Sequence, residues 1–144
     1  MIKKILKALV LLFVLIQFYR PVKNISTVTP ITDFLLSSKA DDLTSGLFKN
    51  TCYDCHSNNT KYPWYNNIAP VSWILADHVD EGKEELNFSE WTTFSDKRKN
   101  HKLEEIVEML EEGEMPLKGY LIMHSEAKLS KGDVDKMIRF VKEL

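Results

Sequence analysis

Two cysteines separated by two residues and followed at once by a histidine constrain this chain more than any other feature. The pattern is Cys52-Tyr53-Asp54-Cys55-His56, and the chain has no other cysteine. On a helical turn, two thiols at this spacing can each form a thioether with one vinyl group of a haem, and the adjacent histidine then reaches the iron. The spacing therefore predicts one covalently bound haem c, with Cys52 and Cys55 as attachment points and His56 as the proximal iron ligand.

Two other uses of a C-x-x-C pair fit this sequence less well. A zinc site needs a second pair of ligands, and His78, His101 and His124 do not have the H-x₃₋₅-H spacing that would supply one. A thioredoxin-like redox pair lies in a βαβ unit, and the chain shows no convincing alternating strand pattern. Haem attachment is therefore the favoured function of the motif.

The remainder of the chain has the apolar spacing of helices. Helices are predicted around residues 41–50, 70–86, 103–110 and 134–141. Asp41 or Asp42 can cap the first of these helices. Gly113 stands where a C-terminal glycine belongs, and Ser130 with Asp133 forms an S-x-x-D capping box before the last helix. Only five glycines and five prolines argue against a turn-rich all-β fold. The prediction is an all-α fold: a small cytochrome c-like helical domain around one haem, preceded by a membrane-anchor helix.

The first 23 residues have the pattern of an export signal. Residues 1–7 are basic and Ala8 to Ile16 is an unbroken apolar run, but no small-residue cleavage site follows. We therefore expect an uncleaved anchor in which a helix from Ile2 to Val22, about 31 Å long, crosses the membrane. The division that follows is a transmembrane segment over 1–23, an extended tether over 24–40 and a haem-binding domain over 41–144.

The charges are distributed unevenly between these parts. Residues 1–23 carry five basic side chains and no acidic one, which leaves 14 basic and 21 acidic side chains for residues 24–144. Positive charge before the apolar run predicts that Met1 stays in the cytoplasm and the haem domain faces the periplasm from the inner membrane. The net charge of −2 for the whole chain argues against binding of nucleic acid.

Met115 is the predicted distal iron ligand. A thioether can bind haem iron opposite a histidine. Met115 follows the Gly113 helix stop, and Pro116 favours an extended backbone at Met115, so that its side chain can turn inward. The alternatives that spacing does not exclude are His78, on the apolar stripe of its helix, and the neighbours Met123 and His124, which precede the last helix.

Aromatic residues also follow the motif closely, in the run Tyr62-Pro63-Trp64-Tyr65. Their polar atoms can donate to a haem propionate, but packing around the haem edge is the simpler expectation. Trp73 and Trp91 are predicted to be core residues.

The sequence from about Leu43 to Leu144 resembles the bacterial haem-binding domain family of small exported c-type haem proteins. The resemblance lies in the stretches CYDCHSNNTKYPWYNNIAPVSWILADHVDEGKEELNFSEW and GEMPLKGYLIMHSEAKLS. It implies a single-haem domain of the cytochrome c type, and it supports haem binding more strongly than any cellular role.

These observations together predict an electron-transfer protein rather than an enzyme. No nucleophile–base arrangement or paired carboxylate suggests other chemistry. The expected partners are redox proteins of the periplasm or inner membrane. The alternative is a haem-based sensor or ligand-binding module, in which the sixth coordination site is weak or open.

Overall fold

The computed structural model describes residues 1–144, and every regular element in it is a helix. The α-helices are α1 (Ile2–Ile16), α2 (Phe34–Ser37), α3 (Asp42–Thr51), α4 (Tyr53–His56), α5 (Val71–Glu85), α6 (Asp96–Glu112), α7 (Lys118–Met123) and α8 (Lys131–Lys142). The 3₁₀ helices are η1 (Trp64–Asn67), η2 (Phe88–Thr93) and η3 (Ser125–Ala127). The prediction of an all-α fold is confirmed.

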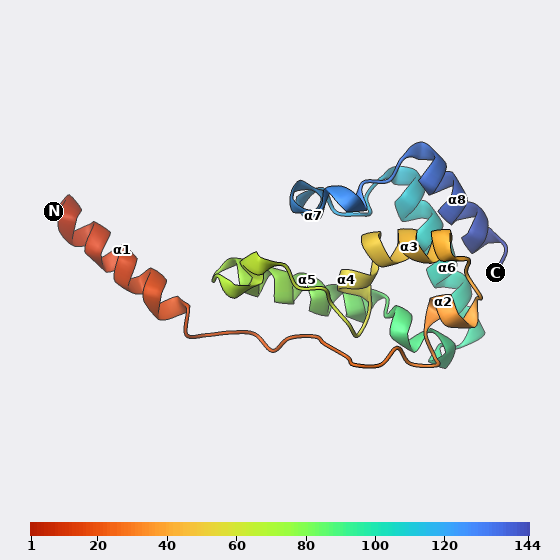
Figure 1. The fold of residues 1–144 in the computed structure, drawn as a ribbon, viewed down its shortest axis with the longest axis horizontal. Coiled ribbons are helices and arrows are strands. Elements are labelled where there is room, and N and C mark those ends of the chain that lie inside the picture. Colours follow the sequence, from red (N-terminus) through yellow and green to blue (C-terminus); the bar gives the residue numbers. More distant parts are fainter.

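The N-terminal helix is shorter than the sequence predicted. Helix α1 ends at Ile16 after 15 residues and projects away from the other helices (Figure 1). Pro21 disfavours a helical backbone at Arg20, and the Gln17 side chain is bonded both to Phe13 and to Ala69 beyond the helix. No helix of the structure has the length and apolar character needed to cross a membrane. The predicted helix from Ile2 to Val22 is therefore wrong in its C-terminal bound, which lies at Ile16.

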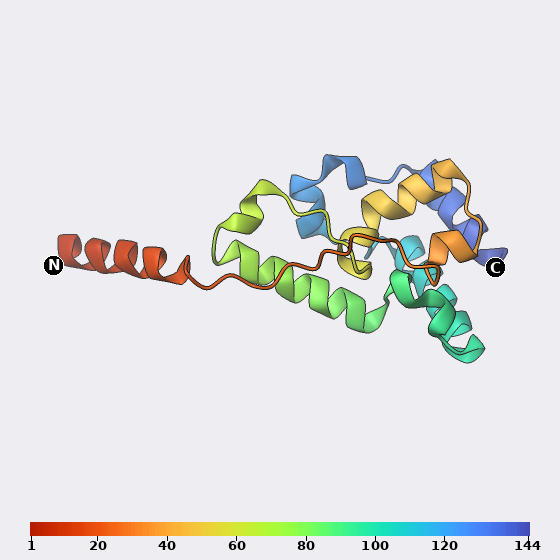
Figure 2. The same ribbon diagram turned by 60° about the horizontal axis from the view of Figure 1, so that its bottom comes forward.

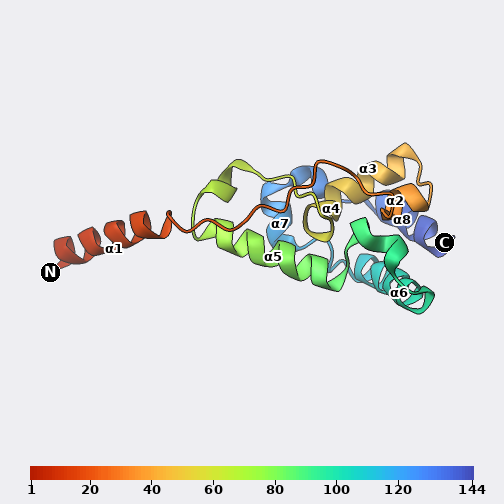
Figure 3. The same ribbon diagram turned by 90° about the horizontal axis from the view of Figure 1, so that it is seen from below.

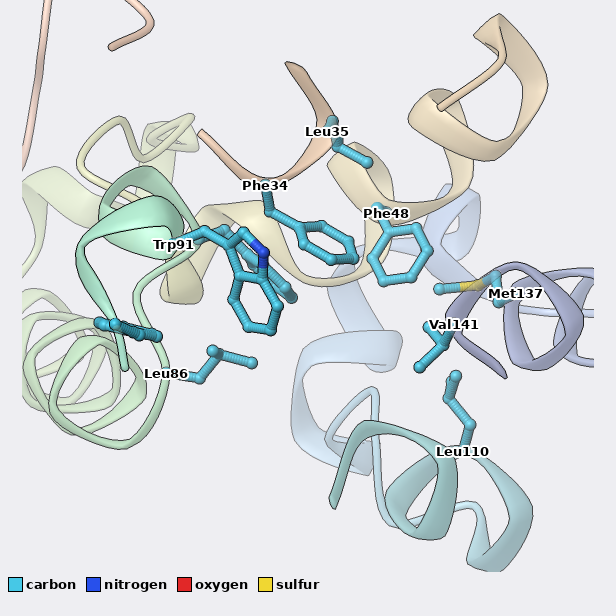
Figure 4. Close-up of a cluster of buried hydrophobic side chains, with 10 residues drawn as sticks. Phe34, Leu35, Phe48, Leu86, Trp91, Leu110, Met137 and Val141 are labelled. Atoms are coloured by element: carbon cyan, nitrogen blue, oxygen red, sulfur yellow. The ribbon is translucent and has the colours of Figure 1, made fainter. Parts of the chain in front are cut away.

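Residues 24–40 are not a free extended tether. Asp33 caps α2 by accepting from the backbone N–H groups of Leu35 and Leu36. Phe34 has no exposed surface, and its ring lies between those of Trp91 and Phe48 (Figure 4). The segment from α2 onward thus belongs to the folded core. The sequence concealed this because α2 has one turn and shows no periodicity.

Aromatic side chains from distant segments form the centre of the core. Besides Phe34 and Phe48, it contains Phe88 and Trp91 from η2, with ring centroids 4.9–6.0 Å apart in edge or tilted contacts with Phe34 or Phe48. Met137 closes the cluster from α8 (Figure 4). Burial of Trp91 agrees with the sequence prediction, whereas Trp73 is only half-buried.

The predicted helix ends match the observed caps. The Asp41 side chain accepts from the backbone of Thr44, Gly113 ends α6 at φ 67°, and both hydrogen bonds of the Ser130–Asp133 box are present. Helix α6 begins seven residues before Leu103, at Asp96, where Ser95 caps it. Its first two turns are polar, so the apolar stripe did not reveal them.

The arrangement of the helices brings α4, which carries the cysteine motif, against the long helix α5, while α6 packs on α8 (Figures 2 and 3). Gly82 of α5 lies at the contact with α4. A Cβ atom added to Gly82 would stand 2.9 Å from the Cys55 carbonyl oxygen and 3.0 Å from the Cys55 Cβ. Only glycine lets the two backbones approach this closely.

Two glycines inside helices should therefore respond oppositely to the same substitution. Gly46 of α3 has open space around its missing Cβ, so Gly46→Ala should raise the free energy of unfolding by about 1 kcal/mol through helix propensity. Gly82→Ala should lower it by roughly 1–3 kcal/mol, because α4 must move. Urea denaturation followed by circular dichroism measures both. Equal stabilisation by the two substitutions would show that the α4–α5 contact is loose.

Candidate functional site

The cysteine motif forms a single helical turn at the edge of the core. Cys52 caps α4, Cys55 lies within it, and both are half-buried free thiols. Burial raises the pKa of each thiol to about 11, so both are protonated at neutral pH. The turn presents the two sulfur atoms from one short element, as covalent attachment to a single group requires.

The His56 imidazole is oriented by a backbone carbonyl just beyond α5. His56 Nδ1 lies 3.0 Å from the Leu86 carbonyl oxygen. A carbonyl can only accept, so Nδ1 carries the proton and Nε2 keeps its lone pair. Burial lowers the pKa of His56, which favours the neutral imidazole. A histidine whose second nitrogen donates to a carbonyl is the usual arrangement of a metal-ligating histidine.

The two residues between the cysteines hold α4 in place, although the motif itself specifies neither. The Tyr53 ring stacks on Phe88 at 5.1 Å with an interplanar angle of 5°, and its hydroxyl donates to Asp33. Asp54 accepts from the backbone N–H of Lys61 at 3.1 Å. Asp54 also accepts from the Tyr120 hydroxyl at 2.7 Å. The sequence alone does not indicate these roles, because nothing in the local pattern reveals the partners of Tyr53 and Asp54.

Two cavities border the cysteines and the histidine of the motif, and both are lined by Cys52, His56 and Met115. The first measures about 300 Å³ and the second about 240 Å³. Their combined volume falls within the roughly 300–1,000 Å³ of ligand pockets. The first is bordered on its apolar side by Leu86, Phe88, Ile106, Met109 and Leu110. The second also contains Cys55, His78, Gly82, Pro116, Leu117 and Tyr120.

These residues fit a haem on three counts. First, two thiols and an oriented imidazole with a free Nε2 come from one helical turn. Second, Met115, whose thioether can bind iron, lines the same cavities. Third, much of the lining is apolar. Ligand-binding sites for flat apolar groups have this composition, with a few placed polar atoms.

Charged residues lie at the rim of the first cavity. Lys102 bonds to Glu105 at 2.6 Å and lies 3.6 Å from Glu85. Glu108 also lines this cavity, and Glu81 lines the second. Acidic side chains exceed basic ones here, so a group with an extra positive charge is favoured in the space they surround.

The other predicted ligands lie in different surroundings. His78 is exposed and lines the second cavity. Met123 lines neither cavity and is 55% exposed. His124 is buried, and both its ring nitrogens have partners: Nε2 bonds to the Tyr65 hydroxyl at 2.7 Å, and Nδ1 lies 3.1 Å from a Glu126 oxygen. Among the four candidates, Met115 and His78 therefore share a cavity with His56.

The aromatic run after the motif does not border either cavity. The Tyr62 hydroxyl accepts from the Asn24 backbone N–H, and Trp64 is 71% exposed. Tyr65 pairs with His124. The structure therefore supports neither role expected for this run, which were contact with a haem propionate and packing at the haem edge.

Comparison with known proteins gives one clear match. The model of the haem-binding domain family matches residues 11–143 of the chain. No curated protein and no solved structure matches significantly. The match covers nearly the whole chain and includes every residue of the two cavities, so this chain belongs to the haem-binding domain family.

Proposed function

We propose that this protein is a mono-haem c-type cytochrome that transfers electrons, with Cys52 and Cys55 as covalent attachment points. His56 and Met115 are the residues that would hold its iron. The observation that carries this proposal is that His56 and Met115, from α4 and from the segment after α6, border the same two cavities. Paired imidazole and thioether ligands are typical of electron carriers, because a six-coordinate iron leaves no site for a substrate.

Met115 is preferred over His78 because of the elements that carry the two side chains. The Leu86 carbonyl that orients His56 immediately follows α5, so the end of α5 lies behind the imidazole, on the side of Nδ1. His78 belongs to this same helix, one turn before Gly82 at the α4 contact. Met115 comes from a different segment, beyond the end of α6. A distal ligand must approach from the face opposite the proximal one, which favours Met115.

The protein's own groups account for how such a site would work. When bound, the haem supplies a one-electron ferric–ferrous couple. His56 would offer Nε2 to the iron in a fixed tautomer, because the Leu86 carbonyl accepts from Nδ1–H. Phe88 and Leu110 exclude water from one side of the cavity. The acidic rim would stabilise the more positive oxidation state of a bound haem and so lower its reduction potential, whereas the Met115 thioether would raise it.

Covalent attachment can be tested on the intact chain expressed with c-type maturation. The haem should stay with the polypeptide after denaturation in acidic organic solvent. Replacing both cysteines by alanine should abolish retention, while His56→Ala should permit thioethers but lose the low-spin spectrum. Free extraction of haem from the unmodified chain would overturn the covalent assignment.

The distal ligand can be tested by three alanine substitutions. Met115→Ala should remove the sixth ligand, lower the reduction potential and let carbon monoxide bind to the ferrous haem. His78→Ala and Met123→Ala serve as matched controls and should leave the spectrum low-spin. An unmodified protein that already binds carbon monoxide readily would favour the sensor function. If Met115→Ala keeps the low-spin spectrum and one control variant loses it, the residue replaced in that control variant is the distal ligand instead of Met115.

We also propose that residues 1–23 export the domain and hold it at the outer face of the cytoplasmic membrane. Ile2 to Leu15 are all exposed, and three lysines precede the apolar run of α1. Thioether attachment of haem takes place outside the cytoplasm, which requires export. Intact-mass measurement on the native protein should give a chain that retains residues 1–23 in the membrane fraction. A soluble chain starting near residue 24 would contradict the anchor.

A further inference from the structure

The segment that carries Met115 lies apart from the main core. This distal segment, residues 115–124, contains α7, and all three ribbon views place α7 to one side of the α6–α8 pair (Figures 1–3). Two of its side chains make hydrogen bonds to other parts of the molecule. Tyr120 donates to Asp54, and His124 bonds to Tyr65. The first bond ends on the cysteine motif itself.

The Tyr120 side chain is well fixed for this contact. Its ring stacks on that of His124 with centroids 4.0 Å apart and an interplanar angle of 10°. Its hydroxyl lies 2.7 Å from Asp54 Oδ2. Burial, together with the hydrogen bond to Asp54, raises the pKa of Tyr120, so the phenol remains a donor at neutral pH. A short hydrogen bond to a carboxylate is among the stronger ones in proteins.

The hydrogen bond from Tyr120 to Asp54 matters because of where Asp54 lies in the cysteine motif. Asp54 lies between Cys52 and Cys55, on the turn that also presents His56. Tyr120 lines the same cavity as Met115, five residues further along the chain. The bond therefore joins the element that carries the proximal ligand to the segment that carries the distal one, across the space between them.

We propose that Tyr120 is a positioning residue whose hydrogen bond to Asp54 holds the distal segment against the cysteine motif and so sets how firmly Met115 binds the iron. This rests on the proposed function, in which Met115 is the distal ligand. Without the bond, the distal segment moves away more often, Met115 leaves the iron more often, and external ligands gain access to the sixth site.

The test measures ligand exchange in the haem-loaded, full-length protein. The ferrous form is mixed with carbon monoxide, and the rate of binding is recorded for the unmodified protein, Met115→Ala and Tyr120→Phe. Met115→Ala defines the fully open site. Tyr120→Phe keeps the ring and its stack on His124 but removes the donor. It should bind carbon monoxide roughly tenfold faster than the unmodified protein, because a hydrogen bond to a charged group contributes about this factor to an equilibrium.

Tyr62→Phe is the matched control. Tyr62 is also half-buried and hydrogen-bonded through its hydroxyl, but to the backbone of Asn24 and outside the distal segment. Both substitutions should lower the melting temperature, Tyr120→Phe by more because its bond is to a carboxylate, while only Tyr120→Phe should speed carbon monoxide binding. A merely structural role of Tyr120 would change stability without this selective effect.

Asp54→Ala completes a double-mutant cycle. Asp54→Ala also removes the acceptor of the Lys61 backbone N–H, so it should speed carbon monoxide binding at least as much as Tyr120→Phe. The double variant should bind carbon monoxide no faster than Asp54→Ala alone. Additive effects, or an unchanged rate in Tyr120→Phe beside a fast Met115→Ala, would overturn the role of Tyr120 and leave the ligand assignment standing. An unchanged rate in Met115→Ala would instead overturn the proposed ligand, since the bond then has no distal methionine to position.

Discussion

The hydrogen bond from His56 Nδ1 to the Leu86 carbonyl links the chemistry of the site to the packing of the core. Leu86 is itself a core residue, and it ends α5, the helix on which α4 packs. The close contact at Gly82 determines how near the motif comes to this carbonyl. If α4 moved outward, His56 would lose the hydrogen bond that fixes both its tautomer and the orientation of its ring. The site therefore depends on a helix–helix distance that a single missing Cβ makes possible.

The two variable positions of the motif, Tyr53 and Asp54, also tie the geometry of the site to the packing around it. Tyr53 joins α4 to Phe88 and Asp33 of the core, whereas Asp54 faces Tyr120 of the distal segment. The cysteines and histidine supply the chemistry, and their two neighbours determine what surrounds it. One turn of four residues is too short to hold its own shape in water, so its geometry comes from these tertiary contacts.

The electrostatics of the site act in two directions. An acidic rim with Lys102 paired to Glu105 and Glu85 would favour the oxidised form of a bound haem, while the proposed methionine ligand would favour the reduced form. Exposure of the rim limits the first effect, since surface charges are screened by salt. In the proposed haem site, the Met115 ligand would therefore be the stronger determinant of the potential, and the proposed role of the distal segment would act through that ligand.

Much of the fold was predictable from local patterns. The caps at Asp41, Gly113 and Ser130 and the helices beside them depend on nearest neighbours in the chain, and sequence alone determined them, as it did the cysteine motif. What only the tertiary structure decided is the burial of Phe34, the approach at Gly82 and the bond between Tyr120 and Asp54. Partners such as Tyr120 and Asp54 lie 66 residues apart. Their contact arises from how helices pack, which no local spacing encodes, because side-chain periodicity specifies the buried face of a helix but not which distant residue meets it.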